Sequence, residues 1–339
     1  MAVKVKEKKS TFTPLTIVLL VFLCIYCISL FYMLAWGVFT SFKVNDDVFE
    51  ENVAGFFADY LGYYSKWNKS SSLDDIDKAY FLKQSLLEMG GKDWLLPFHT
   101  YINMFTEFVV DTQSMPGIKG RNVSMPEMYL YSLLYAGGCS FAATFVPCIT
   151  AYACARFKYK FSRIVYNTVI IVMMIPIVGS MPSEINIAWK TGVMNKIWGL
   201  WIMRANFLGL YFLVFYDVCK SLPMSFSEAA KIDGANNFQI FFQIAMPLIR
   251  NTFMTVLLIK FIAFWNDYQA AMVFMPSYPT VATGLNRIMN VNADSCKYAY
   301  ETVPARMSAV VMTATPVCIL FAIFQKRLLG NLTVGGVKG

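Results

Sequence analysis

Several features that mark enzymes and nucleotide-binding proteins are missing from this chain of 339 residues. It has a single histidine, His99, and no G-x-x-x-x-G-K-[S/T] run that could hold ATP phosphates. The cysteines show neither zinc-ligand spacing nor the pattern of a disulfide framework. We therefore expect no catalytic site, no metal and no bound cofactor, and we interpret His99 as a hydrogen-bonded surface residue.

Charge is also scarce, since only 15% of the residues are charged while 57% are hydrophobic. This balance excludes an ordinary soluble domain and indicates a protein embedded in membrane lipid. The net charge of +8 could suggest a nucleic-acid partner. The basic residues, however, cluster beside apolar runs, as membrane topology signals do, so we expect no nucleic acid to bind.

The apolar residues form runs that are long enough to span a membrane. The first run, residues 15–39, follows four lysines within residues 1–14 and is too long for a secretory signal. Further spans are predicted at about 128–155, 164–181, 197–216, 250–274 and 307–324. We therefore predict an all-α integral membrane protein with six transmembrane helices, in the cell membrane, with both termini in the cytoplasm.

A polar segment, residues 40–126, separates the first two predicted spans and is unusually large for such a connection. We expect it to be extracellular and partly folded, with a helix over Leu73–Met89 that Ser72 caps and Gly90 ends. It could contact a partner protein, or it could be a packed spacer. Residues 127–328 then form the transmembrane core, and residues 329–339 form a cytoplasmic tail.

The polar loop at residues 220–247 is the most distinctive part of this core. Ser225 and Glu228 have the spacing of a capping box, which predicts that a helix begins there. Asp233 and Gly234 supply the residues that end it, because glycine tolerates a positive φ. The sequence therefore predicts a short helix on the cytoplasmic surface.

A second helix is predicted directly after this turn. Asn236 or Asn237 can cap it, and we expect it to break or kink at Pro247 as the fifth span begins. The product would be a helix-turn-helix knob. Periodicity alone leaves two interpretations open: a docking element for another protein, or a plain connection between two spans.

Residues 228–235 read E-A-A-x-x-D-G-A, and Pro247 stands thirteen positions after Gly234. This order resembles the EAA loop of ABC importer permeases, and more narrowly the sugar permeases related to the maltose and maltodextrin importer. The stretches AYACARFKYKFSR and MMIPIVGSMP and the terminal GGVKG are similar to the same permeases. The resemblance covers residues 95–339 and the first span.

The resemblance implies a set of partners. They are a second homologous permease, a cytoplasmic ABC ATPase dimer that binds ATP and Mg, an extracellular solute-binding protein, membrane lipid and a sugar substrate. The ATPase would dock on the knob and the tail, through Glu228, Ala229, Ala230, Asp233, Gly234, Pro247, Gly336 and Lys338.

Polar groups inside the predicted spans indicate a substrate path, because they are costly to expose to lipid. Lys260 is predicted near mid-depth of the fifth span, with Asp267 on nearly the same helical face. We hypothesise that Lys260 faces a cavity and favours an acidic or phosphorylated sugar; the alternative is a lysine paired with a neighbouring helix. The other candidates are Trp265, Asn266 and Asn206, while Arg204 is expected to snorkel toward the surface.

Two rival functions remain open from the sequence. A self-sufficient secondary transporter usually shows internal repeats, and we find none that is convincing. A membrane-anchored receptor or scaffold would have no need of polar groups in the fifth span. The secondary transporter also leaves the cytoplasmic loop unexplained.

Overall fold

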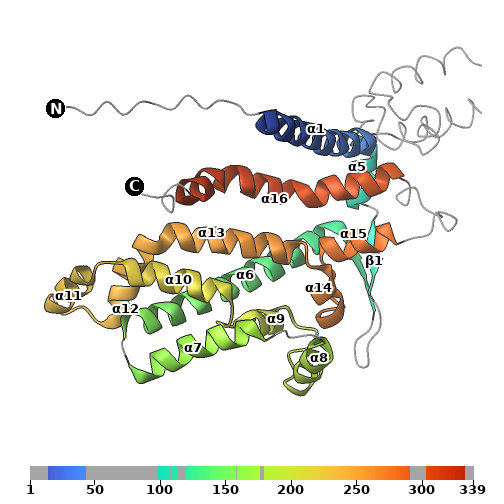
Figure 1. Ribbon diagram of the computed structural model, residues 1–339. Coiled ribbons are helices and arrows are strands. Elements are labelled where there is room, and N and C mark those ends of the chain that lie inside the picture. Colours follow the sequence, from blue (N-terminus) through green and yellow to red (C-terminus); the bar gives the residue numbers. More distant parts are fainter. Residues whose placement is uncertain are drawn as a thin grey trace, which may run out of the picture. The chain divides into compact units, whose positions relative to one another are not determined.

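The computed structural model describes residues 14–42, 98–106, 108–112, 120–157, 159–175, 179–290 and 303–332. These residues are mostly helical (Figure 1). The chain divides into two compact units, of which the first comprises Met1–Ile102 and Cys296–Val311. The second unit comprises Asn103–Ser295 and Met312–Gly339 and holds every site discussed below.

Helix α1, Pro14–Ser41, belongs to the first unit and confirms the helix predicted for the first span. Near its end, the Phe42 ring packs against Phe98 and Tyr101, with ring centroids 5.7 and 5.3 Å apart respectively. The Tyr101 hydroxyl also bonds to the Ser41 hydroxyl. Polar and aromatic side chains therefore hold the end of α1 against the start of α5.

The second unit is a helical bundle with one small strand pair. Its central helix is α6, which packs along α9, α10 and α13. The elements that follow α1 are α5 (His99–Thr106), β1 (Val109–Asp111), β2 (Asn122–Ser124), α6 (Met125–Arg156), α7 (Lys160–Met174), α8 (Met181–Lys190), α9 (Ile197–Arg204), α10 (Leu210–Ser221), α11 (Met224–Ile232), α12 (Asn237–Gln239), the π-helix η2 (Ile240–Ala245), α13 (Met246–Trp265), α14 (Tyr268–Phe274), α15 (Val281–Met289) and α16 (Val303–Leu332). Strands β1 and β2 are antiparallel, with Val110 opposite Val123, and are a small departure from the predicted all-α fold.

Small residues on α6 allow its neighbours to approach closely, as helices in lipid require. The indole of Trp201 on α9 lies directly over Gly138, where any Cβ atom would overlap it. That indole also donates a hydrogen bond of 3.0 Å to the carbonyl oxygen of Leu134. On the other side, Phe212 and Phe215 of α10 are fully buried in a cluster that includes Phe253 of α13.

Four helices are long and apolar enough to cross a membrane in the described part of the chain: Thr16–Ser41, Met125–Arg156, Asn237–Trp265 and Val303–Gln325. They correspond to the predicted first, second, fifth and sixth spans. Helix α7 has 15 residues, or about 22 Å, which is shorter than a hydrocarbon core of about 30 Å. The third predicted span is therefore not a single membrane-length helix.

The fourth predicted span is also not one helix. It is divided into α9 and α10 by residues 205–209, and Gly209 there has a φ of 149°. This φ is open to glycine but strained for other residues, so the helix cannot continue through it. An apolar run alone does not reveal such a break.

The fifth predicted span, 250–274, has different bounds in the structure. Helices α12, η2 and α13 are continuous, and α13 ends at Trp265, before the separate short helix α14. The predicted break at Pro247 is wrong, because Pro247 lies in the first turn of α13, directly after η2, while the alternative of a kink there stays a prediction. The wider π-helical turn accommodates a residue that lacks an N–H group and crowds the preceding turn.

Some predictions concern residues outside the described ones. They are the helix at Leu73–Met89, the four N-terminal lysines, and Gly336 and Lys338 in the tail. The proposed boundaries of the extracellular segment and of the tail stay predictions.

Candidate functional site

Helix α11 forms the first half of the predicted knob, but it starts earlier than the sequence suggests. Pro223 is its N-cap residue, and no side chain caps the helix. The predicted capping box of Ser225 and Glu228 is therefore wrong. Proline has a fixed φ suited to a helix start, so Ser225 lies inside the first turn.

The end of α11 confirms the prediction made for Gly234. Gly234 has a φ of 84°, and its amide donates to the carbonyl of Lys231 at 3.1 Å. The next amide, that of Ala235, donates to the carbonyl of Ala230 at 2.9 Å. These two bonds are those of a Schellman motif, which ends helices with a left-handed residue. The turn between the two knob helices is thus fixed by hydrogen bonds.

Asn236, and not Asn237, begins the second helix of the knob. Its side-chain oxygen accepts from the Gln239 amide at 2.8 Å, and the Gln239 side chain accepts from the Asn236 amide at 2.8 Å. This reciprocal pair is a capping box, in which asparagine and glutamine replace the usual serine and glutamate. The predicted second helix is confirmed.

Arg156, the last residue of α6, ties the knob to the bundle. Its guanidinium donates to the carbonyl oxygen of Leu222 at 3.0 Å and contacts the sulfur of Met224 at 2.7 Å. A cation at the end of α6 also complements the partial negative charge of that helix terminus. The sequence indicated Arg156 only as a marker of membrane topology.

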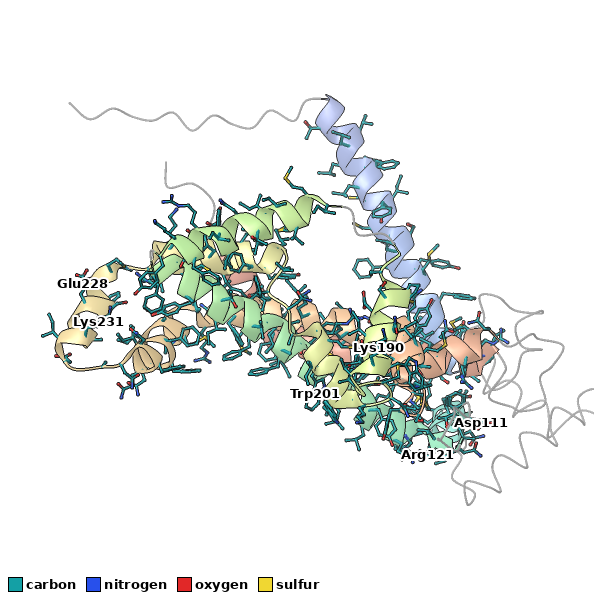
Figure 2. All side chains as sticks on the ribbon, turned by 90° about the horizontal axis from the view of Figure 1, so that it is seen from below. Asp111, Arg121, Lys190, Trp201, Glu228 and Lys231 are labelled. Atoms are coloured by element: carbon teal, nitrogen blue, oxygen red, sulfur yellow. The ribbon has the colours of Figure 1, made fainter. Side chains whose placement is uncertain are left out.

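The knob presents exposed apolar side chains at one end of the second unit. Ile232 is 87% exposed and Phe238 is 72% exposed, although both are large and apolar. Figure 2 shows Glu228 and Lys231 at this end and Asp111 and Arg121 at the opposite end. Among the predicted docking residues, Glu228, Ala229, Asp233, Gly234 and Pro247 are exposed, whereas Ala230 is buried. Apolar groups left open at a tip are typical of a surface that binds another protein.

A cavity of about 490 Å³ lies between α6, α10, α13 and the link from α9 to α10. Three of the five predicted path residues line it, namely Lys260, Asp267 and Asn206. Lys260 is five residues before Trp265, the last residue of α13, so it lies toward one end of that helix, and its depth in the membrane stays a prediction. Its ammonium is 4.7 Å from the centroid of the Tyr211 ring.

Asp267 reaches the cavity from a different element than predicted. It lies beyond α13 and is the N-cap of α14, so the shared helical face with Lys260 is wrong. One carboxylate oxygen accepts from the Ala270 amide at 3.0 Å, and the other accepts from the Tyr135 hydroxyl at 3.0 Å. The helix is interrupted between α13 and α14, and this interruption turns Asp267 toward the same cavity.

Trp265 and Asn266 do not line the cavity. The Trp265 side chain is 4% exposed, and its indole donates to the carbonyl of Thr313 at 3.0 Å. The Asn266 side chain donates to the carbonyl of Ile262 at 3.0 Å, at the end of α13. Both therefore act as packing and capping residues in this structure.

Arg204 lines the cavity, contrary to the expectation that it would snorkel to the surface. Its guanidinium lies 3.9 Å from a carboxylate oxygen of Glu184, which is an ion pair but too long for a hydrogen bond. Its Nε atom is buried without a hydrogen-bond partner. Gly209 was missed because the sequence does not show the break that brings α10 to the cavity, and Tyr135 was missed because its partner Asp267 is 132 positions away in the sequence. No group of metal-ligating residues occurs in the parts of the chain that the structure describes.

Comparisons with known proteins agree with this architecture. Residues 143–332, more than half of the chain, match the family of binding-protein-dependent transport system inner membrane components. The maltodextrin transport system permease protein of Streptococcus pneumoniae is 29% identical over 226 residues, 62% of this chain and 74% of that protein. The melibiose, raffinose and stachyose import permease protein of Bacillus subtilis is 26% identical over 267 residues, 77% of this chain and 90% of that protein.

A similar fold occurs in the crystal structure of a bacterial ABC transporter involved in the import of the acidic polysaccharide alginate. The TM-score is 0.50 at 21% identity, over 76% of this chain and 98% of that one. This likeness concerns the fold alone. Together with the family match and the membrane-length helices, it leads to one conclusion: the chain belongs to the family of binding-protein-dependent transport system inner membrane components, and is a mostly helical membrane protein.

Proposed function

We propose that this chain is one permease subunit of an ATP-driven importer for carbohydrates, specifically oligosaccharides, and that it forms half of the translocation path. The observation that carries the proposal is the exposed knob, whose turn has a defined hydrogen-bonded geometry and whose tip exposes the apolar side chains of Ile232 and Phe238. The relatives' names, which include maltodextrin and raffinose permeases, support a sugar as the substrate.

The knob is suited to transmit movement to the cavity. Its second helix continues without interruption into α13, which carries Lys260. Its first helix is tied through Arg156 to α6, which lines the other side of the cavity. A separate ATPase dimer, with ATP and Mg bound, would therefore shift the cavity helices by moving the knob, provided that it binds one state more tightly than the other.

In this proposal the chain crosses the membrane six times. Helix α7 with the residues after it, and the pair α9 and α10, would supply the two crossings that are not single long helices. The knob, the N-terminus and the tail with Gly336 and Lys338 would face the cytoplasm and the ATPase. The segment 40–126 would face the extracellular binding protein, and a second homologous permease would complete the path.

Uptake by reconstituted vesicles tests this function. We expect vesicles with this chain, the second permease, the ATPase and the binding protein to accumulate a labelled maltooligosaccharide or raffinose-type sugar only when ATP is enclosed. Omission of the ATPase or of the binding protein should abolish accumulation. Uptake by this chain alone, without ATP, would show a secondary carrier and overturn the proposal.

A further inference from the structure

The polar groups that line the cavity carry an excess of positive charge. Two cations, Arg204 and Lys260, line it together with a single carboxylate, that of Asp267. In the part of the chain that the structure describes, Lys260 forms no ion pair with a carboxylate. Its ammonium instead faces the Tyr211 ring, which is a weaker partner than a carboxylate.

The one carboxylate of the cavity is already engaged. Each oxygen of Asp267 accepts a hydrogen bond, from the Ala270 amide and from the Tyr135 hydroxyl. Among the described residues, Arg204 pairs with one carboxylate, that of Glu184, at the long distance of 3.9 Å, and its buried Nε has no acceptor. Arg204 and Lys260 are partly buried and neither has a close carboxylate partner there, so both are open to an anionic ligand.

The start of α10 adds a third feature that favours an anion. The N-cap residue Gly209 offers no side chain to cap the helix, and Gly209, Leu210 and Tyr211 all line the cavity. The first amides of a helix carry partial positive charge and lack partners within the helix. They therefore attract a negatively charged group when one is within reach. The break in the fourth predicted span creates this helix start.

From these features we infer that the cavity binds a carbohydrate through an anionic group, such as a uronate carboxylate, a sulfate or a phosphate. This inference rests on the proposed carbohydrate transport function and assigns its substrate class. The anionic group would lie near Lys260, Arg204 and the start of α10. The rings of Tyr211, Phe207 and Phe264 would contact the faces of the sugar, and the Asn206 amide would bind its hydroxyls.

A pair of ligands that differ only in charge tests the inference. The complex of both permeases with the ATPase is placed in phosphatidylcholine nanodiscs, without the binding protein, which would bind sugar itself. Affinities are measured for trigalacturonate and for its carboxyl-reduced, neutral counterpart. We expect trigalacturonate to bind at least about tenfold more tightly, as a charge-assisted hydrogen bond contributes. Equal affinities, or no binding of either ligand, would overturn the inference.

Variants identify the groups responsible. Lys260→Met and Arg204→Gln should each weaken trigalacturonate binding by about tenfold and leave the neutral ligand unchanged. Lys260→Arg should retain most of the preference, because it keeps the charge. Lys190→Met is the matched control, since Lys190 is an exposed cation on α8, outside the cavity. An equal loss for both ligands in Lys260→Met would show a structural role and contradict the inference.

A lipid headgroup presents the same chemistry as a phosphorylated sugar, so the measurement is repeated with phosphatidylglycerol in the nanodiscs. Retained preference for trigalacturonate supports a sugar ligand, whereas loss of that preference assigns the cations to lipid and overturns the inference. Failure of the proposed transport function can be distinguished from failure of this inference. Selective binding without ATP-dependent uptake would refute transport, and uptake without charge preference would refute only the inference.

Discussion

At the scale of single residues, the contact between Gly138 and Trp201 shows how tightly α6 and α9 pack. The indole occupies the place where a side chain at 138 would begin. Its hydrogen bond to the carbonyl of Leu134 fixes the ring there. The same contact positions Arg204 at the end of α9, and hence one of the two cavity cations.

We expect Gly138→Ala to destabilise the protein, because the added methyl group must displace the Trp201 ring. The expected loss is about 1–3 kcal/mol, typical of overpacking, and would appear as a lower melting temperature of the purified complex. Gly137→Ala is the control, since nothing lies within 4 Å of a Cβ atom there. Equal melting temperatures of the two variants would contradict the packing described for α6 and α9.

At the scale of elements, the knob is held by its two ends and by Arg156. Helix α11 follows α10 through Leu222 and Pro223, and the Schellman turn at Gly234 connects it to the next helix. The bond from Arg156 to Leu222 joins the start of α11 to α6, and the Phe241 ring of η2 packs on the Tyr152 ring of α6, with ring centroids 4.8 Å apart. Movement of α11 should therefore reach α6 through Arg156, in addition to the path through these rings.

This arrangement predicts a defect of coupling in Arg156→Met. The variant loses a charge-assisted hydrogen bond, so we expect fewer sugar molecules transported per ATP hydrolysed while the ATPase still binds. The ratio is measured by parallel uptake and phosphate-release assays in vesicles. Arg163→Met, which removes an exposed cation of α7, serves as the control. An unchanged ratio in Arg156→Met would show that the tie to α6 carries no movement.

Local signals in the sequence predicted the knob well where the chain itself decides the conformation. Gly234 ends α11, and Asn236 begins α12, because glycine and asparagine act on their own backbone neighbours. The start of α11 was missed, since Pro223 is its N-cap residue and the helix has already begun when the chain reaches Ser225. The break at Gly209 and the π-helical turn before Pro247 were also missed, because a run of apolar residues does not show where a helix breaks or changes its winding.

The cavity was predictable only in part for the same reason. Lys260, Asp267 and Asn206 stood out as polar residues in apolar runs, and the structure brings them together. Arg204 was expected to reach the membrane surface because the fourth predicted span was taken as one helix, whereas α9 ends at Arg204 beside the cavity. Tyr135 gave no signal in the sequence, since its role depends on a contact with Asp267, 132 positions later.

At the scale of the whole molecule, docking of a cytoplasmic ATPase requires the knob and the opposite end of the second unit to face different sides of the membrane. Figure 2 places Glu228 and Lys231 at one end and Asp111 and Arg121 at the other. Helix α6 extends between these ends over 32 residues, or about 48 Å, which is enough to cross the hydrocarbon core.

A prediction about membrane sidedness follows. Cysteine placed at Ile232 or at Arg121, in a chain whose own cysteines are replaced by alanine, should react with a membrane-impermeant maleimide from opposite sides. Ile232→Cys should be labelled only in inside-out vesicles, and Arg121→Cys only in right-side-out vesicles. Labelling of both from the same side would contradict the proposed topology.

Docking of the ATPase on the knob is tested most directly by retention of the ATPase in membranes or purified complexes that carry variants of Gly234. The φ of 84° at this position is costly for valine but tolerated by asparagine. We predict that the unaltered chain and Gly234→Asn copurify with the ATPase, whereas Gly234→Val loses it at an unchanged amount of permease in the membrane. Retention of the ATPase by Gly234→Val at the level of the unaltered chain would contradict the claim that the knob is its docking site.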